Sequence, residues 1–373
     1  MFKFLDLLDK SEKIKFFSIF FLLLIASFLE VLSIGAIVPL VENLVSNKNT
    51  QFIESIINKY SLNLFSENFT INIVIIVFLI FIFKNLFLFF LIWYRSKFVI
   101  YLRAKWQAKL LQIYLNQNFI FHSKKNSSIL IRNIQQEINQ ALNSYLSPFL
   151  EFCLNMLIII LIVISLLFIY PTTTIIVVLF FGSSAFFINF FVKKIVYRIG
   201  EIRQETSLKM LQHMQESFSN ILYVKLMRLE NFFLNLFNPH NFKIAKFGVK
   251  RVLYGAAPKL IFEILFIATV SFYILFVIKS GGSKDLLFSK LIIFVIASLK
   301  IIPALNSITN NYQKFRFGLP ALDLVYKELT NLNFKPTKKK LERINLETDI
   351  QIKNVSFKFD NKKNLFNNLN FII

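Results

Sequence analysis

The chain has 373 residues, 55% of them hydrophobic, and a formal net charge of +22. Soluble domains contain about 45–50% apolar residues, and the apolar residues here gather in uncharged runs such as 154–169. These numbers exclude a wholly soluble enzyme and a disordered chain. The one cysteine, Cys153, excludes a disulfide framework, and the three histidines are too widely spaced for a metal motif, so we expect no metal site.

The first 15 residues carry apolar side chains at positions 2, 4, 5, 7 and 8 among charged ones. This pattern predicts a short amphipathic helix over 1–15 that lies at the inner membrane interface.

Six apolar segments follow, each of about 20–27 residues and therefore long enough to cross a hydrocarbon core of about 30 Å. We place them at 16–40, 71–94, 146–169, 172–192, 252–278 and 286–309. Pro171 interrupts the longest apolar stretch, so the third and fourth spans form a hairpin with a very short turn. The predicted fold class is an all-α membrane protein with a six-helix transmembrane domain over 16–319.

The charged residues are distributed unevenly between the spans. Segment 95–142 holds eight Lys and Arg against one acid, and 193–251 holds eleven against four, whereas 41–70 holds two lysines against three glutamates. Positive loops stay in the cytoplasm, so both basic segments and both termini are expected there. Few turn signals interrupt the basic segments, so we expect the spanning helices to continue into them as long cytoplasmic extensions. Because most of the charge flanks membrane spans, we expect a lipid bilayer as partner and no nucleic acid.

The predicted external segment contains an apolar helical face. Phe52, Ile53, Ile56, Ile57 and Tyr60 share one side of a helix, with Glu54 off it. Two interpretations remain open: a packed surface helix, or a helix that lies on the outer leaflet beside a lipid path.

The composition of the sequence changes after residue 310. A polar stretch containing Pro336 predicts a linker over 320–348. Residues 349–373 then alternate apolar and polar side chains, which is typical of β-strands. They read as the beginning of a soluble domain.

Three lysines lie inside apolar spans: Lys84, Lys259 and Lys300. A lysine at the centre of a membrane helix costs about 2.5–3.5 kcal/mol. At a rise of about 1.5 Å per residue, Lys84 and Lys300 lie about 20 Å from the outer ends of their spans, and Lys259 about 10 Å from the inner end of its span. They thus share one depth. Each lysine either pairs with an acid or snorkels to the headgroups, or the three line a positively charged cavity that a dimer doubles.

This order of elements resembles the ATP-binding cassette (ABC) exporters of the six-helix type. Residues 350–371, IQIKNVSFKFDNKKNLFNNLNF, are similar to the first hairpin of the family's nucleotide-binding domain. The resemblance implies a homodimer that uses ATP and Mg²⁺, with Phe359 at the adenine-stacking position. Segments 126–138 and 223–237 resemble the two coupling regions, which places Ser128 and Arg132 in the first and Lys225 and Glu230 in the second. Ordinary solvated helix faces are the alternative for both segments.

Within that family the chain resembles the bacterial lipid-linked oligosaccharide flippases of the N-glycosylation pathway, through SFLEVLSIGAIVPL at 27–40 and through the external helix. The resemblance implies location in the bacterial inner membrane and a lipid-linked glycan substrate. It also implies that the external helix handles the lipid tail and that Lys84, Lys259 and Lys300 bind pyrophosphate. Lysine keeps the charge of the family's arginines but loses their two-pronged hydrogen bonding.

The motifs needed for ATP hydrolysis are missing from this sequence. No glycine follows Gly318, so a glycine-rich phosphate loop is absent and no catalytic residue is predicted. We expect a transmembrane half of an exporter, cut off within its nucleotide-binding domain. The alternatives are an exporter of peptides, drugs or other lipids, and a truncated remnant without transport activity.

Overall fold

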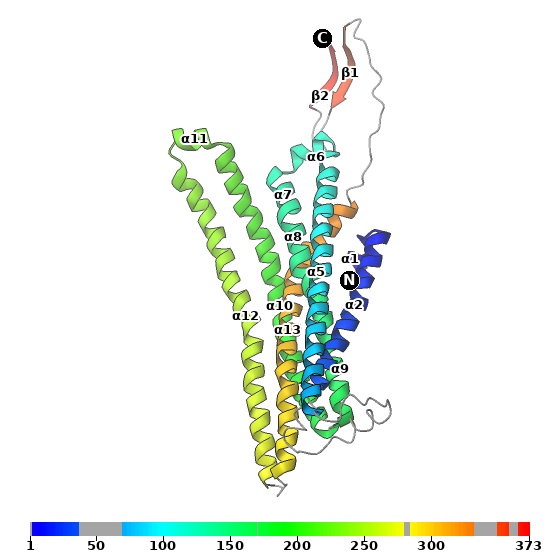
Figure 1. The fold of residues 1–373 in the computed structure, drawn as a ribbon. Helices are drawn as coiled ribbons and strands as arrows, with labels where there is room; N and C mark the ends of the chain where they lie inside the picture. The colour runs from blue at the N-terminus through cyan, green and yellow to red at the C-terminus, as the bar shows by residue number, and fades with distance from the viewer. Residues whose placement is uncertain (1, 37–68, 170, 280–283, 332–348, 358–364) are drawn as a thin grey trace. The chain divides into compact units, whose positions relative to one another are not determined.

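The structure is a computed structural model that describes residues 2–36, 69–169, 171–279, 284–331, 349–357 and 365–373. The chain divides into two units, Met1–Phe334 and Lys335–Ile373. Among the described residues, all the helices belong to the first unit and both strands to the second (Figure 1).

Four very long helices make up most of the first unit. They are α5 (Phe69–Leu115), α10 (Pro171–Ser219), α12 (Glu230–Lys279) and α13 (Lys284–Asn331). Helices α10, α12 and α13 pack against one another, and the hairpin of α10 and α12 diverges from α5 toward its tip (Figure 1). Each of the four helices has between 47 and 50 residues. A helix of this length spans about 70 Å, more than twice the hydrocarbon core of about 30 Å. Part of each helix must therefore extend beyond an apolar layer, as the long uninterrupted segments of the sequence predict.

A fifth long helical stretch is interrupted by two π-helical segments. It consists of α7 (Ser127–Arg132), η2 (Asn133–Glu137), α8 (Ile138–Ala141), η3 (Leu142–Leu146) and α9 (Ser147–Ile169). The segments η2 and η3 are π-helical, a winding that appears mostly as single-turn bulges in α-helices. The next helix begins at Pro171, where a proline is tolerated because the first helical N–H has no partner within the helix. The predicted break between the third and fourth spans is therefore confirmed.

Two short helices close the hairpins at the same end of the bundle (Figure 1). Helix α6 (Phe119–Lys124) lies between α5 and α7, and α11 (Ile221–Leu226) lies between α10 and α12. The side chain of Asn118 caps α6 by accepting a hydrogen bond of 3.0 Å from the backbone N–H of Phe121.

The N-terminus forms two helices rather than the single helix predicted over 1–15. Helix α1 (Phe2–Asp6) ends before a turn, and α2 (Lys10–Gly35) begins at Lys10. The Glu12 carboxylate accepts a 2.8 Å hydrogen bond from the backbone N–H of Asp9, which satisfies a donor at the start of α2. Phe4 anchors α1 against α2 and α5 through ring contacts of 5.6 Å to Phe16 and 5.8 Å to Trp106.

Helix α13 is the central helix of the first unit and packs against α9, α10, α12 and η3. Two glycines allow the closest approaches. A Cβ added at Gly318 would lie 2.6 Å from the backbone carbon of Ser144, and one added at Gly200 would lie 2.5 Å from the backbone oxygen of Phe317. Only glycine fits these two backbone crossings without a shift.

The predicted linker over 320–348 begins later than expected. Helix α13 continues to Asn331 because Leu322, Val325 and Leu329 extend its buried face by nearly two more turns. The remainder of that linker, 332–348, lies outside the described residues.

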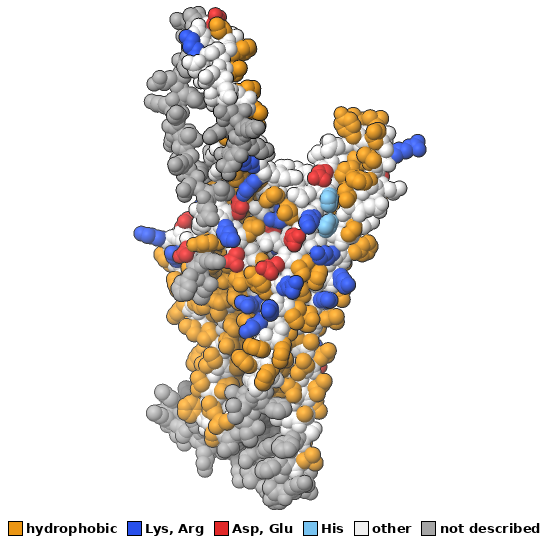
Figure 2. Space-filling view, turned by 180° about the vertical axis from the view of Figure 1, so that it is seen from behind, with side chains coloured by type: hydrophobic (Ala, Val, Ile, Leu, Met, Phe, Trp, Pro, Cys, Tyr) orange, Lys and Arg blue, Asp and Glu red, His pale blue; other side chains and the backbone are white. Residues whose placement is uncertain are grey.

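Apolar helices and exposed apolar side chains identify the membrane-facing part. Within the described residues, four helical stretches are long and apolar enough to cross a membrane: Lys10–Ser33, Val74–Leu115, Ser127–Phe168 and Glu230–Ser271. They include most of the first, second, third and fifth predicted spans. Segments 172–192 and 286–309 are helical within α10 and α13. The count of six spans stays a prediction. Figure 2 shows apolar side chains over one half of the bundle and most charged ones over the other.

The second unit contains the two strands predicted within 349–373. Strands β1 (Gln351–Phe357) and β2 (Phe366–Ile372) pair antiparallel, with Gln351 opposite Ile372 and Phe357 opposite Phe366. Nearly every residue of both strands is exposed. An isolated two-stranded hairpin is marginally stable in water, because its two strands bury little apolar surface against each other.

Candidate functional site

Lys84 lies between α2 and α5 and is almost completely buried, with 3% of its surface exposed. Its Nζ lies 3.3 Å from Oε2 of Glu30 and donates a 3.4 Å hydrogen bond to the hydroxyl of Ser33. The same ammonium lies 4.5 Å from the ring centroid of Phe81. Of the alternatives open from the sequence, Lys84 therefore follows the one in which the lysine pairs with an acid. It joins α2 to α5 and is enclosed by them.

Lys259 has a different environment on α12. Its side chain is 62% exposed, and its Nζ lies 3.8 Å from Oε1 of Glu263, one helical turn away. That separation is near the limit for an ion pair, and exposed pairs contribute little. The backbone of Lys300 lies within α13, but its side chain is outside the described part of the structure.

The lysines predicted to form one ring therefore lie in unlike surroundings. Helix α5, which carries Lys84, packs mainly against α2, whereas α12, which carries Lys259, packs against α10 and α13. A single chain does not bring Lys84 and Lys259 together, and Lys84 is not directed into open space. Depth along a helix does not fix which side of the helix a lysine occupies, and that side separates a cavity-lining lysine from one held between helices.

The first predicted coupling region is interior rather than surface. Ser128 and Arg132 are 2% and 4% exposed. Arg132 donates hydrogen bonds of 3.1 Å to the backbone carbonyl of Gln204 and 2.9 Å to the side chain of Asn133. A docking surface needs exposure, so neither residue serves as one in this structure. The hairpin tip lies before them in sequence, at α6.

A buried carboxylate that the sequence reasoning missed lies beside Arg132. Glu137 is fully buried, and it accepts hydrogen bonds of 3.0 Å from Arg203 and 3.1 Å from Gln204 on α10. Its Oε1 lies 3.9 Å from Nε of Arg132. One signal could have found it: Glu137 is the single acid in the basic segment 95–142. This cluster connects the α7–α9 stretch to α10 at the charged end of the bundle.

Both hairpin tips expose apolar side chains. On α6, Phe119 is 84% exposed, and around α11 Leu222, Leu226 and Met227 are each 65–70% exposed. They lie at the end of the bundle where most of the charged side chains gather (Figure 2). Contiguous exposed apolar surface marks a contact with another protein or with a membrane.

The second predicted coupling region does lie at a tip. Lys225, in α11, and Glu230, the first residue of α12, form a 3.0 Å ion pair on the surface. Between them Arg228 has a φ of 53°, a left-handed backbone conformation that reverses the chain direction within a few residues. The pair therefore spans the turn from α11 into α12 and leaves the apolar side chains of α11 exposed.

Two predicted sites fall outside the described residues: the lipid-tail helix with Phe52, Ile53, Ile56 and Ile57, and the adenine-stacking Phe359. The residues of the second unit do not fit a site for ATP and Mg²⁺. A phosphate cradle needs a glycine-rich loop at a helix N-terminus, and Lys335–Ile373 contains no glycine. The described part of that unit is a β-hairpin.

Comparison with known protein families gives one finding. The family model for the ABC transporter transmembrane region matches residues 16–302. The chain belongs to this family. It is accordingly the membrane part of a transport protein and lies in a lipid bilayer as a multi-pass protein.

Proposed function

We propose that this ABC transmembrane region is one half of a homodimeric exporter in the bacterial inner membrane, with both termini in the cytoplasm. The observation that carries the proposal is the pair of helical hairpins that extend from apolar helices and end in the exposed apolar tips of α6 and α11. Such tips suit docking to a nucleotide-binding domain, which would hold ATP and Mg²⁺. The residues of this chain do not form that nucleotide site.

The proposed cargo is an anionic lipid-linked glycan, in keeping with the resemblance to oligosaccharide flippases. Two features of the chain support a cationic path: Lys259 is mostly exposed on α12, and Lys300 occupies a similar depth on α13. Two copies of the chain would supply both lysines twice. Lys84 is left out of this path because Glu30 neutralises it.

A second candidate is an exporter of a peptide, drug or other lipid. The pairing of Lys84 with Glu30 favours it, because it removes one positive charge from the expected ring.

The test is flipping of a lipid-linked oligosaccharide by the assembled transporter in proteoliposomes. Lys259→Gln and Lys300→Gln are expected to slow flipping at least tenfold, and Lys246→Gln, an exposed lysine on α12 more than three turns before Lys259, serves as the matched control. Unchanged flipping in both variants would contradict the cationic path. Flipping of an uncharged lipid as fast as the glycan lipid would favour the second candidate.

The docking role of the tips is tested separately. Phe119→Ser and Leu226→Ser are expected to weaken association with the nucleotide-binding domain, measured by co-purification of the detergent-extracted complex. Retention of the full association would show that the tips are not the docking surface.

A further inference from the structure

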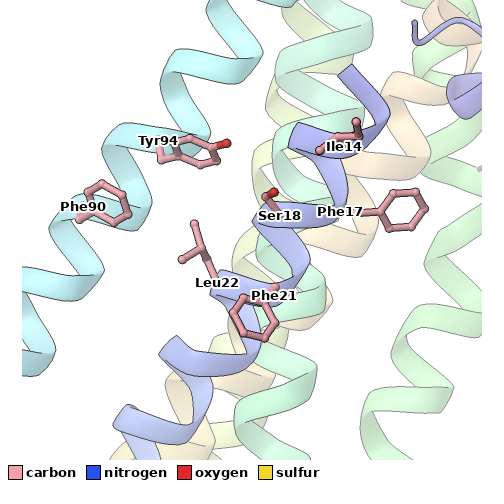
Figure 3. A pocket seen from close by; sticks show the side chains of 7 residues that line it. All are labelled: Ile14, Phe17, Ser18, Phe21, Leu22, Phe90 and Tyr94. Carbon is pink, nitrogen blue, oxygen red and sulfur yellow. The ribbon is translucent and has the colours of Figure 1, made fainter. Parts of the chain in front are cut away.

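An open groove of about 550 Å³ lies between α2 and α5, away from the residues discussed above. It is lined by Ile14, Phe17, Ser18, Phe21 and Leu22 of α2 and by Phe90 and Tyr94 of α5. Figure 3 shows Leu22 and the ring of Tyr94 directed into the space between the two helices. The lining is mainly apolar, and its polar groups are two hydroxyls, on Ser18 and Tyr94.

The two walls of the groove follow the same order along their helices. On α2, Lys15, Ser18 and Leu22 are spaced i, i+3, i+7, and on α5, Lys97, Tyr94 and Phe90 are spaced likewise in the opposite direction. Such spacings place the members of each set on one face of a helix. Along each wall, an apolar side chain is followed by a hydroxyl group and then by a lysine ammonium, over a distance of about 10 Å.

The side chains of Lys15 and Lys97 are both exposed. Lys97 lies 4.9 Å from the ring centroid of Trp93. Tryptophan and lysine together are typical of the level at which lipid headgroups meet the hydrocarbon core. The predicted orientation puts this level at the cytoplasmic leaflet.

We infer that the groove holds one anionic phospholipid of the cytoplasmic leaflet. An acyl chain lies along Leu22 and Phe90, the hydroxyls of Ser18 and Tyr94 meet the glycerol ester region, and the phosphate headgroup lies between Lys15 and Lys97. The occupant follows from charge complementarity, because an acyl chain alone would not explain two cations at the end of the groove. The inference rests on the membrane location but not on the transported substrate.

Native mass spectrometry of the purified full chain, titrated with palmitoyl-oleoyl phosphatidylglycerol or phosphatidylcholine, tests this inference. We expect one tightly bound phosphatidylglycerol and weaker phosphatidylcholine. Lys15→Gln and Lys97→Gln should each weaken phosphatidylglycerol about fivefold, the effect of one basic residue at an anionic membrane surface. Lys109→Gln, further along α5, is the charge-matched control and should leave binding unchanged.

A second pair of variants tests the groove itself. Ser18→Trp fills it and should weaken both lipids at least tenfold, whereas Phe28→Trp, on the exposed side of α2, should not. Elution as a monodisperse species shows that each variant is folded. Equal binding of the two lipids, or unaltered binding to Ser18→Trp, would overturn the inference. Cross-linking of Ser18→Cys between two copies in a Cys153→Ser background would also overturn it, since the groove would then be an interface.

Discussion

The ion pair between Glu30 and Lys84 provides the sharpest test of how the membrane helices are held together. The side chains are 10% and 4% exposed, and their charged atoms are 3.3 Å apart. At an effective dielectric constant of about 20, the Coulomb attraction at this distance is about 5 kcal/mol. Desolvation offsets most of it.

Removing one partner leaves the other charge buried between helices, which costs about 3–5 kcal/mol. Lys84→Met should therefore lower the free energy of unfolding by about this amount. Glu30→Gln should cost less, because the ammonium keeps the Ser33 hydroxyl and the Phe81 ring. The double variant buries no charge and should recover at least about 2 kcal/mol relative to the sum of the single changes.

The measurement is reversible unfolding of the purified protein by sodium dodecyl sulfate in mild detergent, followed by fluorescence. Trp106 is buried against Phe4 and reports on the packed state. Lys225→Met, which removes an exposed ion pair, is the control and should change stability by less than about 1 kcal/mol. Single-variant effects that add to within about 0.5 kcal/mol would refute a coupled pair.

Transport by the wild-type protein, the two single variants and the double variant shows whether Lys84 has a structural role or binds substrate. If Lys84 only joins α2 to α5, the double variant regains transport along with stability. If Lys84 binds substrate, the double variant is stable but does not transport. That result would support the ring of Lys84, Lys259 and Lys300 predicted from the sequence.

Three further predictions concern the bundle outside this pair. Gly318→Ala should destabilise the protein by about 1–3 kcal/mol because its Cβ meets backbone, whereas Gly248→Ala, with nothing within 4 Å, should stabilise α12 by up to about 1 kcal/mol; equal thermal shifts would contradict the close packing of α13. Glu137→Gln should cost about 3–5 kcal/mol in detergent unfolding, since two arginines lose a buried counter-charge, and a neutral result would contradict this network. Hydrogen bonding to Lys105 lowers the pKa of Asp9, so their contact holds the turn between α1 and α2 against α5 above the ordinary pKa of an aspartate and is lost as the pH falls through the lowered value; amide exchange around that turn should rise over that acidic interval, and pH-independent exchange would contradict the link.

Sequence reasoning was most successful where the signal is one-dimensional. Runs of apolar residues predicted long helices, and Pro171 predicted the break between α9 and α10, where it is the first residue of the new helix and its missing N–H costs no hydrogen bond. The strands at the end of the chain followed from alternation of apolar residues.

The predicted site was less accurate for a specific reason. Depth along a helix follows from residue number, but the direction of a side chain follows from its neighbours on other helices. Ser128 and Arg132 were expected at a docking surface and are buried, and the exposed apolar tip at Phe119 was not anticipated. The position of the hairpin turn decided both, since it lies just before the segment chosen from the family resemblance.

The sequence by itself determined that this is a membrane protein built of long helices, with basic segments between its spans and a strand-forming end. These properties depend on composition and periodicity, because each segment enters the bilayer or stays in water according to its own residues. Only the tertiary structure decided that Lys84 meets Glu30, that Glu137 meets Arg203, and that α2 and α5 leave a groove between them. Each of these features joins residues more than fifty positions apart. Such contacts depend on how the helices are rotated and packed against one another, which the sequence of a single segment does not determine.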